Sequence, residues 1–484
     1  MSRLGWILVA LVLAAGGVGG HLYYRLQYAA PAPRFESAED EFLYGSIGNE
    51  DEAGVPYWIW LVLPRIFPEY LPAAGGYASI GVAARDGHDM PIGLSKVQIG
   101  VPRVGTNCAL CHTATVRERR TEAPRIYPGA PGHQIGAQEY RRFLQAAAAD
   151  PRFTASTVLD EIARNVKLSF TDQLLYRFVL IPETRRRLLK EAEAEAAGAT
   201  PPAWGRGRAD VAGGLRRRLL HEPADSTAGA SDVMALWHLE GRRADGYLWD
   251  RSAASLRETV QAKALLAGAP AAWLDREHAV WDRADANQPS SLKRLLDYLT
   301  DLAPPKYPFA VDAALAANGA TLYAANCAQC HDTAGARAHA AIPIDEIGTD
   351  RGRLDAWNAR SAAALNALGD GHGWKFSGFR QPSAGYVAPS LDGVWLTAPY
   401  LHNGSVPALA DLLDYPANRP ARFWRGYDVY DQARVGFVSD GAEAQRLGTP
   451  FDTLKPGNGN GGHAYGTTLS ADEKRALLEY LKTR

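Results

Sequence analysis

Cys108-Ala-Leu-Cys111-His112 and Cys327-Ala-Gln-Cys330-His331 are two copies of the pattern Cys-x-x-Cys-His, and together they use all 4 cysteines of this 484-residue chain. In a c-type haem site the two thiols form thioether bonds to the porphyrin, and the adjacent histidine becomes the proximal iron ligand. The sequence therefore predicts two covalently bound haem c groups with His112 and His331 as iron ligands. No cysteine remains for a disulfide or a free nucleophile.

Two other readings of the cysteines are weaker. Two Cys-x-x-Cys pairs could together form a four-thiolate zinc site, but zinc does not require a histidine directly after each pair. A catalytic dithiol would need a thioredoxin-like βαβ context, which the surrounding sequence lacks.

The N-terminal segment is apolar. No Asp, Glu, Lys or Arg occurs between Arg3 and Arg25. A run approaching the roughly 20 residues that cross a bilayer is typical of a transmembrane anchor or a secretory signal. Because no clear A-x-A site closes it, we expect residues 1–30 to be an anchor, with cleavage near QYAAPAP (27–33) as the alternative. Either case implies export, and Arg3 on the cytoplasmic side would place the rest on the periplasmic side of the bacterial inner membrane.

The charge balance excludes one class of partner. The formal net charge is −1 at pH 7. A near-neutral chain has no electrostatic footprint for nucleic acid, so we expect no nucleic-acid partner.

The remaining chain, roughly 450 residues, is long enough for two or three domains. Apolar residues recur at helical spacing in 143–148, 159–166, 174–179 and 292–302, whereas strand-like alternation is scarce. The fold class is therefore predicted to be mainly α with long loops. Prolines in 303–308 mark a linker, which divides the chain into a first haem c domain with a helical insertion (31–303) and a second cytochrome c domain (304–484).

Three further segments have predictable roles. Residues 56–71 are apolar but contain three prolines, Arg65 and Glu69, so we expect buried core and no bilayer span. Residues 311–325 form an Ala-rich helix that leads to Cys327. Ser470-Ala-Asp-Glu473 is a capping box that begins a C-terminal helix.

Several further motifs resemble the di-haem cytochromes c related to bacterial cytochrome c peroxidases and, more closely, their rubber-oxygenase-like branch. They are MPIGLSK (90–96), NCALCH (107–112), EIGTD (346–350), LDGVW (391–395), APYLHNGSV (398–406) and GNGNGGHAYG (457–466). The stretch 385–406 is the most specific of these. The resemblance implies an exported oxidoreductase in which one haem handles electrons and the other meets an external ligand, and it implies that the two terminal helices of the second domain pack across each other.

The sixth ligand of each iron decides the function, because an iron with one histidine can bind peroxide or dioxygen. Related peroxidases usually carry a methionine just before the segment matching 387–391, and this chain has none there. We therefore expect His463, in its Gly/Asn-rich loop, to ligate the second haem, as its match in the resembled branch does. His402 and His372 are alternatives, with His402 more typical of a structural turn residue.

For the first haem we expect an open or water-bound iron, with Met90 and His88 as weaker candidate ligands. The resemblance points to the segments 235–239 and 247–250 as its pocket lining, which makes Trp249, Asp250 and His238 the candidate catalytic residues. A histidine expected before Trp249-Asp250 is absent, which puts a peroxidase-type acid/base mechanism in doubt.

Two functions remain open. In the first, electrons pass from the His331 haem to an open His112 haem, which reduces peroxide or activates dioxygen. In the second, the protein is a membrane-anchored electron-transfer cytochrome that connects periplasmic or membrane electron donors and acceptors. A haem-based sensor would need an output domain, and none is recognisable.

Overall fold

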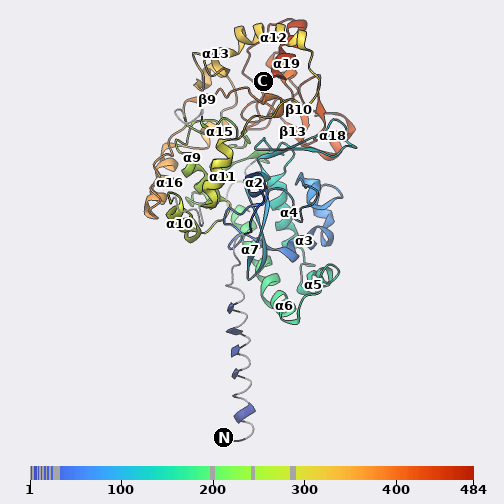
Figure 1. Ribbon diagram of the computed structural model, residues 1–484, viewed down its shortest axis with the longest axis vertical. Helices are drawn as coiled ribbons and strands as arrows, with labels where there is room; N and C mark the ends of the chain where they lie inside the picture. The colour runs from blue at the N-terminus through green and yellow to red at the C-terminus, as the bar shows by residue number, and fades with distance from the viewer. Residues whose placement is uncertain are drawn as a thin grey trace.

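The computed structural model describes residues 33–196, 202–240, 246–283 and 290–484, together with scattered positions between Ser2 and Tyr24. The molecule is mainly helical, as predicted, with the C-terminal part at the top of Figure 1 and the N-terminal part below. The helices are α2 (Ala38–Tyr44), α3 (Tyr57–Ile66), α4 (Ala137–Ala149), α5 (Ala155–Ala163), α6 (Phe170–Leu175), α7 (Ile181–Ala196), α8 (Val211–Arg218), α9 (Leu256–Leu266), α10 (Ala271–Val280), α11 (Ser291–Thr300), α12 (Ala313–Asn326), α13 (Ala328–His331), α14 (Ile344–Ile347), α15 (Gly352–Asp355), α16 (Ala359–Gly371), α17 (Leu409–Leu412), α18 (Gly441–Leu447) and α19 (Ala471–Leu481).

The strands are short and all pair antiparallel. β1, β3 and β2 form a three-stranded sheet in that order, and the other strands form two-stranded ribbons. Their bounds are β1 (Val55–Pro56), β2 (Leu94–Ile99), β3 (Val101–Thr106), β4 (Thr113–Val116), β5 (Arg125–Pro128), β6 (Arg208–Ala209), β7 (Ser231–Asp232), β8 (Ala341–Pro343), β9 (Gly385–Val387), β10 (Arg422–Arg425), β11 (Tyr430–Asp431), β12 (Gly436–Phe437) and β13 (Thr449–Asp452).

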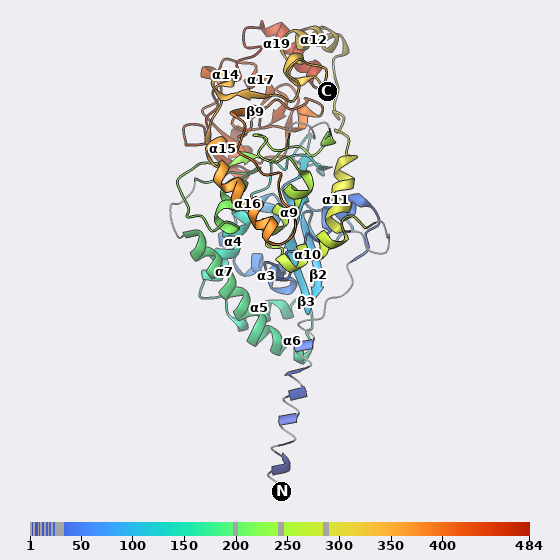
Figure 2. The same cartoon turned by 90° about the vertical axis from the view of Figure 1, so that its left-hand side faces the viewer.

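Two apolar cores underlie the two halves, and they exchange segments. The lower core is built mainly from residues before 300, but Leu365 and Phe376, in and after α16, belong to it. The upper core centres on Trp395 and Leu477, and it includes Val116 and Trp237 from the N-terminal half. Figure 2 shows α16 beside α9 and α10, below the other C-terminal elements. The predicted division at 303/304 stays a prediction, since both cores draw on chain from either side of it.

The terminal helices of the second half cross closely. α19 begins with the predicted capping box, in which Ser470 and Glu473 cap each other's backbone. A Cβ at Gly319 of α12 would lie 2.0 Å from the carbonyl oxygen of Ala476, so only glycine permits this approach. The rings of Tyr323 and Tyr480 lie 5.1 Å apart beside the crossing. The packing implied by the family resemblance is therefore confirmed.

Residues 56–71 are core, as predicted. α3 carries Pro64 in its interior and buries Ile59, Trp60, Val62 and Leu63. The Trp60 ring stacks on Tyr77 at 4.5 Å between ring centroids. Its apolar composition thus serves packing within the lower half.

The predicted anchor, residues 1–30, lies largely outside the described residues. The described positions there, such as Trp6, Val12 and Leu13, are helical and exposed. The ribbon pieces that Figure 1 draws for the described positions lie below the body of the molecule. Among the described residues, no helix combines the length and the apolar character that crossing a membrane requires.

Candidate functional site

Both Cys-x-x-Cys-His motifs fold into the same single helical turn. The amide of His112 donates to the carbonyl oxygen of Cys108 at 3.0 Å, and the amide of His331 donates to that of Cys327 at 3.0 Å. The turn places both thiols and the imidazole on one short piece of chain, which is the arrangement needed for two thioethers and a proximal ligand.

The two proximal imidazoles are oriented in the same way. His112 Nδ1 lies 3.0 Å from the carbonyl oxygen of Met234, and His331 Nδ1 lies 2.7 Å from that of Pro389. A carbonyl accepts only from a protonated nitrogen, so each Nδ1 carries the proton and each Nε2 keeps a free lone pair for a metal. Met234 and Pro389 are thus positioning residues that the motif alone did not reveal.

The surroundings of the thiols do not favour a zinc site or a reactive dithiol. Burial raises the pKa of Cys111 to about 11 and that of Cys327 to about 11, whereas a redox-active dithiol needs a lowered pKa. Within the described chain, which includes all four cysteines, no three or more His, Cys, Asp or Glu side chains converge as a metal-binding group. The four-thiolate zinc alternative requires such convergence.

A large cavity lies beside the second motif. It comprises about 1550 Å³ of empty space, part of which is open to solvent. Cys327, Cys330, His331 and His463 all line it, and most of its wall is apolar. The residues present therefore fit a covalently bound haem at this motif.

His463 faces His331 across this cavity. Their ring centroids are 6.2 Å apart. An ion bound about 2 Å from a nitrogen of each ring, with that nitrogen about 1 Å from its ring centre, would place the centroids roughly 6 Å apart. Burial, and then the proximity of His331, lowers the pKa of His463 to about 3, so this imidazole is neutral and able to ligate. The geometry supports His463 as the opposing ligand.

The loop that carries His463 is held from two sides. The guanidinium of Arg419 donates to the carbonyl oxygens of Asn460, Gly462 and His463 at 2.7, 2.8 and 3.0 Å. Gly462 has a positive φ of 71°, and a Cβ there would lie 2.3 Å from the backbone of Gly348. The glycine-rich composition is therefore required for a close backbone approach that aims His463 into the cavity.

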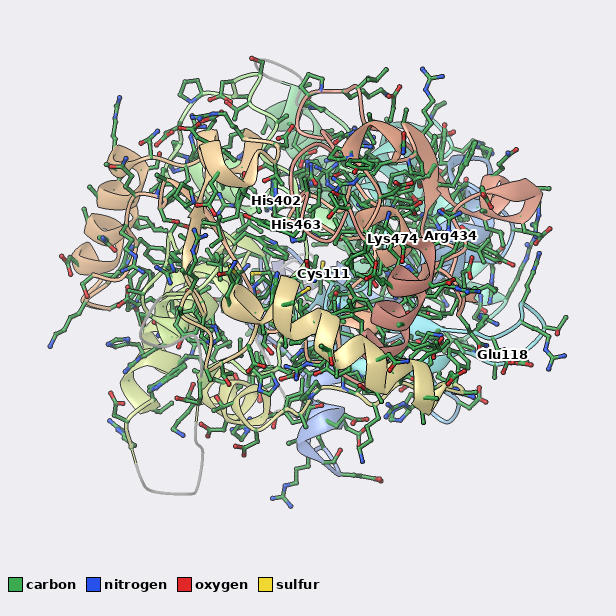
Figure 3. The ribbon with its side chains drawn as sticks, turned by 90° about the horizontal axis from the view of Figure 1, so that it is seen from above. Cys111, Glu118, His402, Arg434, His463 and Lys474 are labelled. Atoms are coloured by element: carbon green, nitrogen blue, oxygen red, sulfur yellow. The ribbon has the colours of Figure 1, made fainter. Side chains whose placement is uncertain are left out.

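The other candidate ligands of the second haem lie differently. His372 is exposed and stacks on Trp374 at 4.3 Å, on the α16 side of the molecule. His402 is buried and lines the same cavity as His463. Figure 3 places His402, His463 and Cys111 near the centre of the projection, with Glu118 at its edge.

The first motif has different surroundings. Cys108, Cys111, His112 and Lys263 of α9 each keep some accessible surface, although desolvation is the leading influence on the pKa of each. Burial, followed by the nearby Lys263 ammonium, lowers the pKa of His112 to about 3. No ring of the described residues stacks on or faces His112.

Lys263 was missed in the sequence. Its neighbours on α9, Gln261, Ala262 and Ala264, are fully or almost fully buried. Within the described chain, the Lys263 side chain makes no hydrogen bond and no ion pair, and burial lowers its pKa. The signal that could have identified it is a lysine flanked on a helix by the apolar residues Ala262 and Ala264. Lysine is almost never buried without a partner, so such a position indicates a functional role.

The three candidate catalytic residues have separate partners. Trp249 lines the second cavity, and its Nε1 donates to the carbonyl oxygen of Asp232 at 2.8 Å. Asp250 is fully buried, forms an ion pair with Arg353 at 3.0 Å and accepts from Ser252. His238 is half exposed, with Nε2 3.1 Å from an oxygen of Asp392. The structure does not bring these three side chains together around one reacting atom.

The other candidate ligands of the first haem, Met90 and His88, contact other parts of the protein. Met90 is buried in the lower apolar core. His88 is exposed and stacks on Tyr44 at 4.3 Å.

Comparisons with known proteins cover the second motif. Residues 385–425 match the family described as RoxA-like, cytochrome c-like, and residues 316–392 match the family described as cytochrome c. The first motif lies outside both ranges.

Two curated relatives come from Sinorhizobium fredii (strain NBRC 101917 / NGR234). The protein named "Uncharacterized protein y4iJ" is 32% identical over 253 residues, covering 38% of this chain and 42% of that protein. The protein named "Uncharacterized protein y4iM" is 34% identical over 235 residues, covering 39% of this chain and 52% of that protein. The matches thus span about half of these relatives or less.

Proposed function

We propose that this protein, whose C-terminal part is a cytochrome c domain of the RoxA-like kind that carries haem c and transfers electrons, is an exported di-haem oxidoreductase. Electrons would pass from the C-terminal haem to an open N-terminal haem, where peroxide is reduced or dioxygen is activated. When bound, the haems supply one-electron redox chemistry and, at an open axial position, a site for a small oxidant.

The observation that carries this proposal is the contrast between the two histidines. His463 lies 6.2 Å from His331, centroid to centroid, whereas the described residues place no ring opposite His112. A centre with two imidazoles is saturated and suits electron transfer, while a centre with one imidazole is accessible to dioxygen or peroxide. Cys108, Cys111 and His112 would hold the reactive haem.

One short segment connects the two centres. The carbonyl oxygen of Met234 accepts a hydrogen bond from His112 Nδ1, and the same residue lines the cavity of His331 and His463. Trp249 supports this segment by donating to the carbonyl oxygen of Asp232. These contacts support an electron route from the second haem to the first in which Trp249 has a positioning role.

Lys263 would supply the polar side chain that an open first haem needs. Asp250 is held in an ion pair with Arg353, and His238 is bonded to Asp392 at the surface. Lys263 makes neither kind of bond within the described chain, so its amine is available to donate a hydrogen bond or a proton to a bound oxidant.

We propose a location on the periplasmic side of the bacterial inner membrane, with the protein anchored through its N-terminus. This proposal rests on the uncharged apolar run after Arg3 and on the exposure of Trp6, Val12 and Leu13. Partners would be a periplasmic or membrane electron donor or acceptor and a small oxidant, with no nucleic acid.

A second function is a pure electron-transfer cytochrome without substrate chemistry. The observation that favours it is Lys263, because burial lowers the pKa of its amine, and a lysine amine near His112 could itself occupy the sixth position of the first iron. Both family matches also fall on the electron-transfer half of the chain.

Carbon monoxide binding tests the proposal. Reduced full-length protein should bind about one carbon monoxide per two haems, which follows from one open axial position. His463→Gly should raise this to about two and convert the low-spin electron paramagnetic resonance signal of the second haem to high-spin. His372→Gly is the matched control and should leave both readouts unchanged. Absence of binding by the wild type would remove the open first haem and leave the electron-transfer function.

A further inference from the structure

His402 lies in a tight turn of the sequence YLHNG, but it is more than a turn residue. Its side chain is 4% exposed and lines the cavity that holds His331 and His463. The imidazole stacks on the ring of Tyr386, with centroids 3.7 Å apart and an interplanar angle of 17°. This stacking fixes the plane of the imidazole at the cavity wall.

The imidazole of His402 lacks hydrogen-bond partners within the described chain. Its Nε2 is buried without a partner, and no described group bonds to its Nδ1. Buried polar atoms are nearly always paired, because an unpaired one carries the cost of its lost hydration. An orphaned nitrogen at a cavity wall indicates that its partner comes from the ligand that fills the cavity.

The charge around His402 shows which kind of partner is missing. Burial, then the nearby Arg208 and Arg353, lowers the pKa of this imidazole to about 3. The guanidinium of Arg208 is buried, and within the described chain it bonds only to Asn458 and to main-chain carbonyl oxygens, with no carboxylate. Arg208 Nε and Arg353 Nη1 are also buried without partners. Arg353 is ion-paired with Asp250 at 3.0 Å, and Asp232, which lines the same cavity, is paired with Arg425. The carboxylates of Asp250 and Asp232 are thus already paired, and the unused donors of this corner suit an anion.

The position of His402 in the cavity matches one end of a haem c. Both thiols of the second motif come from the α12–α13 side. His402 instead stacks on Tyr386 of β9, and its carbonyl oxygen accepts from the Asp232 amide at 2.8 Å. A haem c carries its two propionates on the edge away from its thioethers, so carboxylates would point away from α13.

We infer that His402 binds a propionate carboxylate of the second haem through its unpaired Nε2. This assignment makes His402 a cofactor-holding residue and not an axial ligand. The inference needs only the haem c of the second motif, so it holds whether the first haem is open or closed.

The test compares His402→Leu with His402→Gln in the full-length haem-loaded protein. The midpoint potential of the second haem should fall in His402→Leu, because a propionate that loses its hydrogen-bond donor has a higher negative charge density and stabilises the ferric state. His402→Gln keeps a donor and should stay close to the wild-type potential. The low-spin electron paramagnetic resonance signal should persist in both variants, because His331 and His463 still ligate. His372→Leu is the control, since His372 is exposed and stacks on Trp374.

Two results would overturn the inference. One is a wild-type potential in His402→Leu. The other is loss of the low-spin signal in His402→Leu together with its retention in His463→Gly, which would make His402 the axial ligand. If the leucine variant does not accumulate, His402→Asn replaces it, because asparagine keeps the polarity but is too short to reach. Equal potentials for His402→Asn and His402→Gln would then contradict the propionate contact.

Discussion

The turns formed by residues 108–112 and 327–331 share one structure, but they stand in different surroundings. In both turns the histidine amide donates to the first cysteine at 3.0 Å, and Nδ1 meets a main-chain carbonyl oxygen. Across from His331 stands His463, whereas the ionisable side chain beside His112 is Lys263. The motif thus determines the proximal half of each centre, while remote segments determine the distal half.

The residues that attach a haem and the residues that determine its chemistry therefore lie in different parts of the chain. A five-residue motif can orient one imidazole and two thiols, because all are on one helical turn. The position of His463 opposite His331 depends on Gly462, Arg419 and the backbone near Gly348, none of which belongs to the motif. Chemistry at each haem is therefore set by tertiary packing.

Removing either pair of thiols is expected to have the largest effect on this comparison. Cys108→Ala/Cys111→Ala and Cys327→Ala/Cys330→Ala should each lose one of two covalent haems, because thioethers need both sulfurs. Haem staining of a denaturing gel should fall by about half in each variant, as follows from one haem per motif. A full stain in the first variant would show that the N-terminal motif carries no haem, and it would contradict the assignment of two haem centres.

Lys263→Met should have an intermediate effect that is confined to the first centre. Methionine keeps the length of the side chain but removes the donor. A hydrogen bond to a charged ligand contributes about 1.5 kcal/mol, so cyanide binding to the ferric first haem should weaken about tenfold. Optical titration gives the dissociation constant.

Lys293→Met is the matched control for this prediction. Lys293 lies on the neighbouring α11, is partly exposed and pairs with Asp297 at 2.7 Å. Its substitution should leave cyanide binding unchanged. Equal dissociation constants in the wild type and Lys263→Met would mean that the amine does not face the ligand site.

Substitution of His133 is expected to have the smallest effect, and it tests how a buried histidine affects the stability of the fold. His133 follows the first motif closely in space, since the Gly132 amide donates to the Cys111 carbonyl oxygen at 2.8 Å. Burial lowers the pKa of His133 to about 4, its Nε2 lies 3.1 Å from the Thr115 carbonyl oxygen, and its ring stacks on Phe437 at 3.4 Å. A strongly lowered pKa therefore also occurs at a histidine that is held by protein groups alone.

The sign of the pH dependence follows from that shift. The unfolded chain takes up the proton near pH 6.5, and the folded protein does so only near pH 4, so this stability is complete above pH 6.5 and is lost as the pH falls. At pH 5 the loss should be about 2 kcal/mol, from 1.36 kcal/mol per pKa unit. Urea unfolding at pH 7.5 and pH 5 should show a smaller pH effect in His133→Gln than in the wild type. Parallel pH profiles would contradict this.

Local patterns predicted the helices well. The capping box at Ser470, the helix leading to Cys327 and the buried segment 56–71 all depend on spacing within a few residues. The exchange of segments between the two cores was not predictable in this way. α16 joins the lower core because Trp374 Nε1 donates to Asp275 at 2.8 Å and Phe376 packs beneath Gly369, and these contacts connect distant parts of the chain.

The candidate site shows the same limit. His463 was recognisable because a glycine-rich loop around one histidine is a local feature, and the structure places it opposite His331. Trp249, Asp250 and His238 are close in sequence, but each contacts a different partner. These partners, Asp232, Arg353 and Asp392, come from separate segments of the chain. Lys263 shows only as an unexpected residue until the fold places it beside His112.

The unpaired atoms around the second cavity bear on how the protein matures. Among the described residues, His402 Nε2 and Arg208 Nε are buried and have no acceptor, and the Arg208 guanidinium donates no hydrogen bond to a carboxylate. Such groups are costly inside a protein, so a chain without haem would pay for every orphaned donor when it folds. Haem attachment should therefore act as a quality-control step: chains that fail to acquire haem remain open to proteases, and haem supply sets the amount of protein that accumulates.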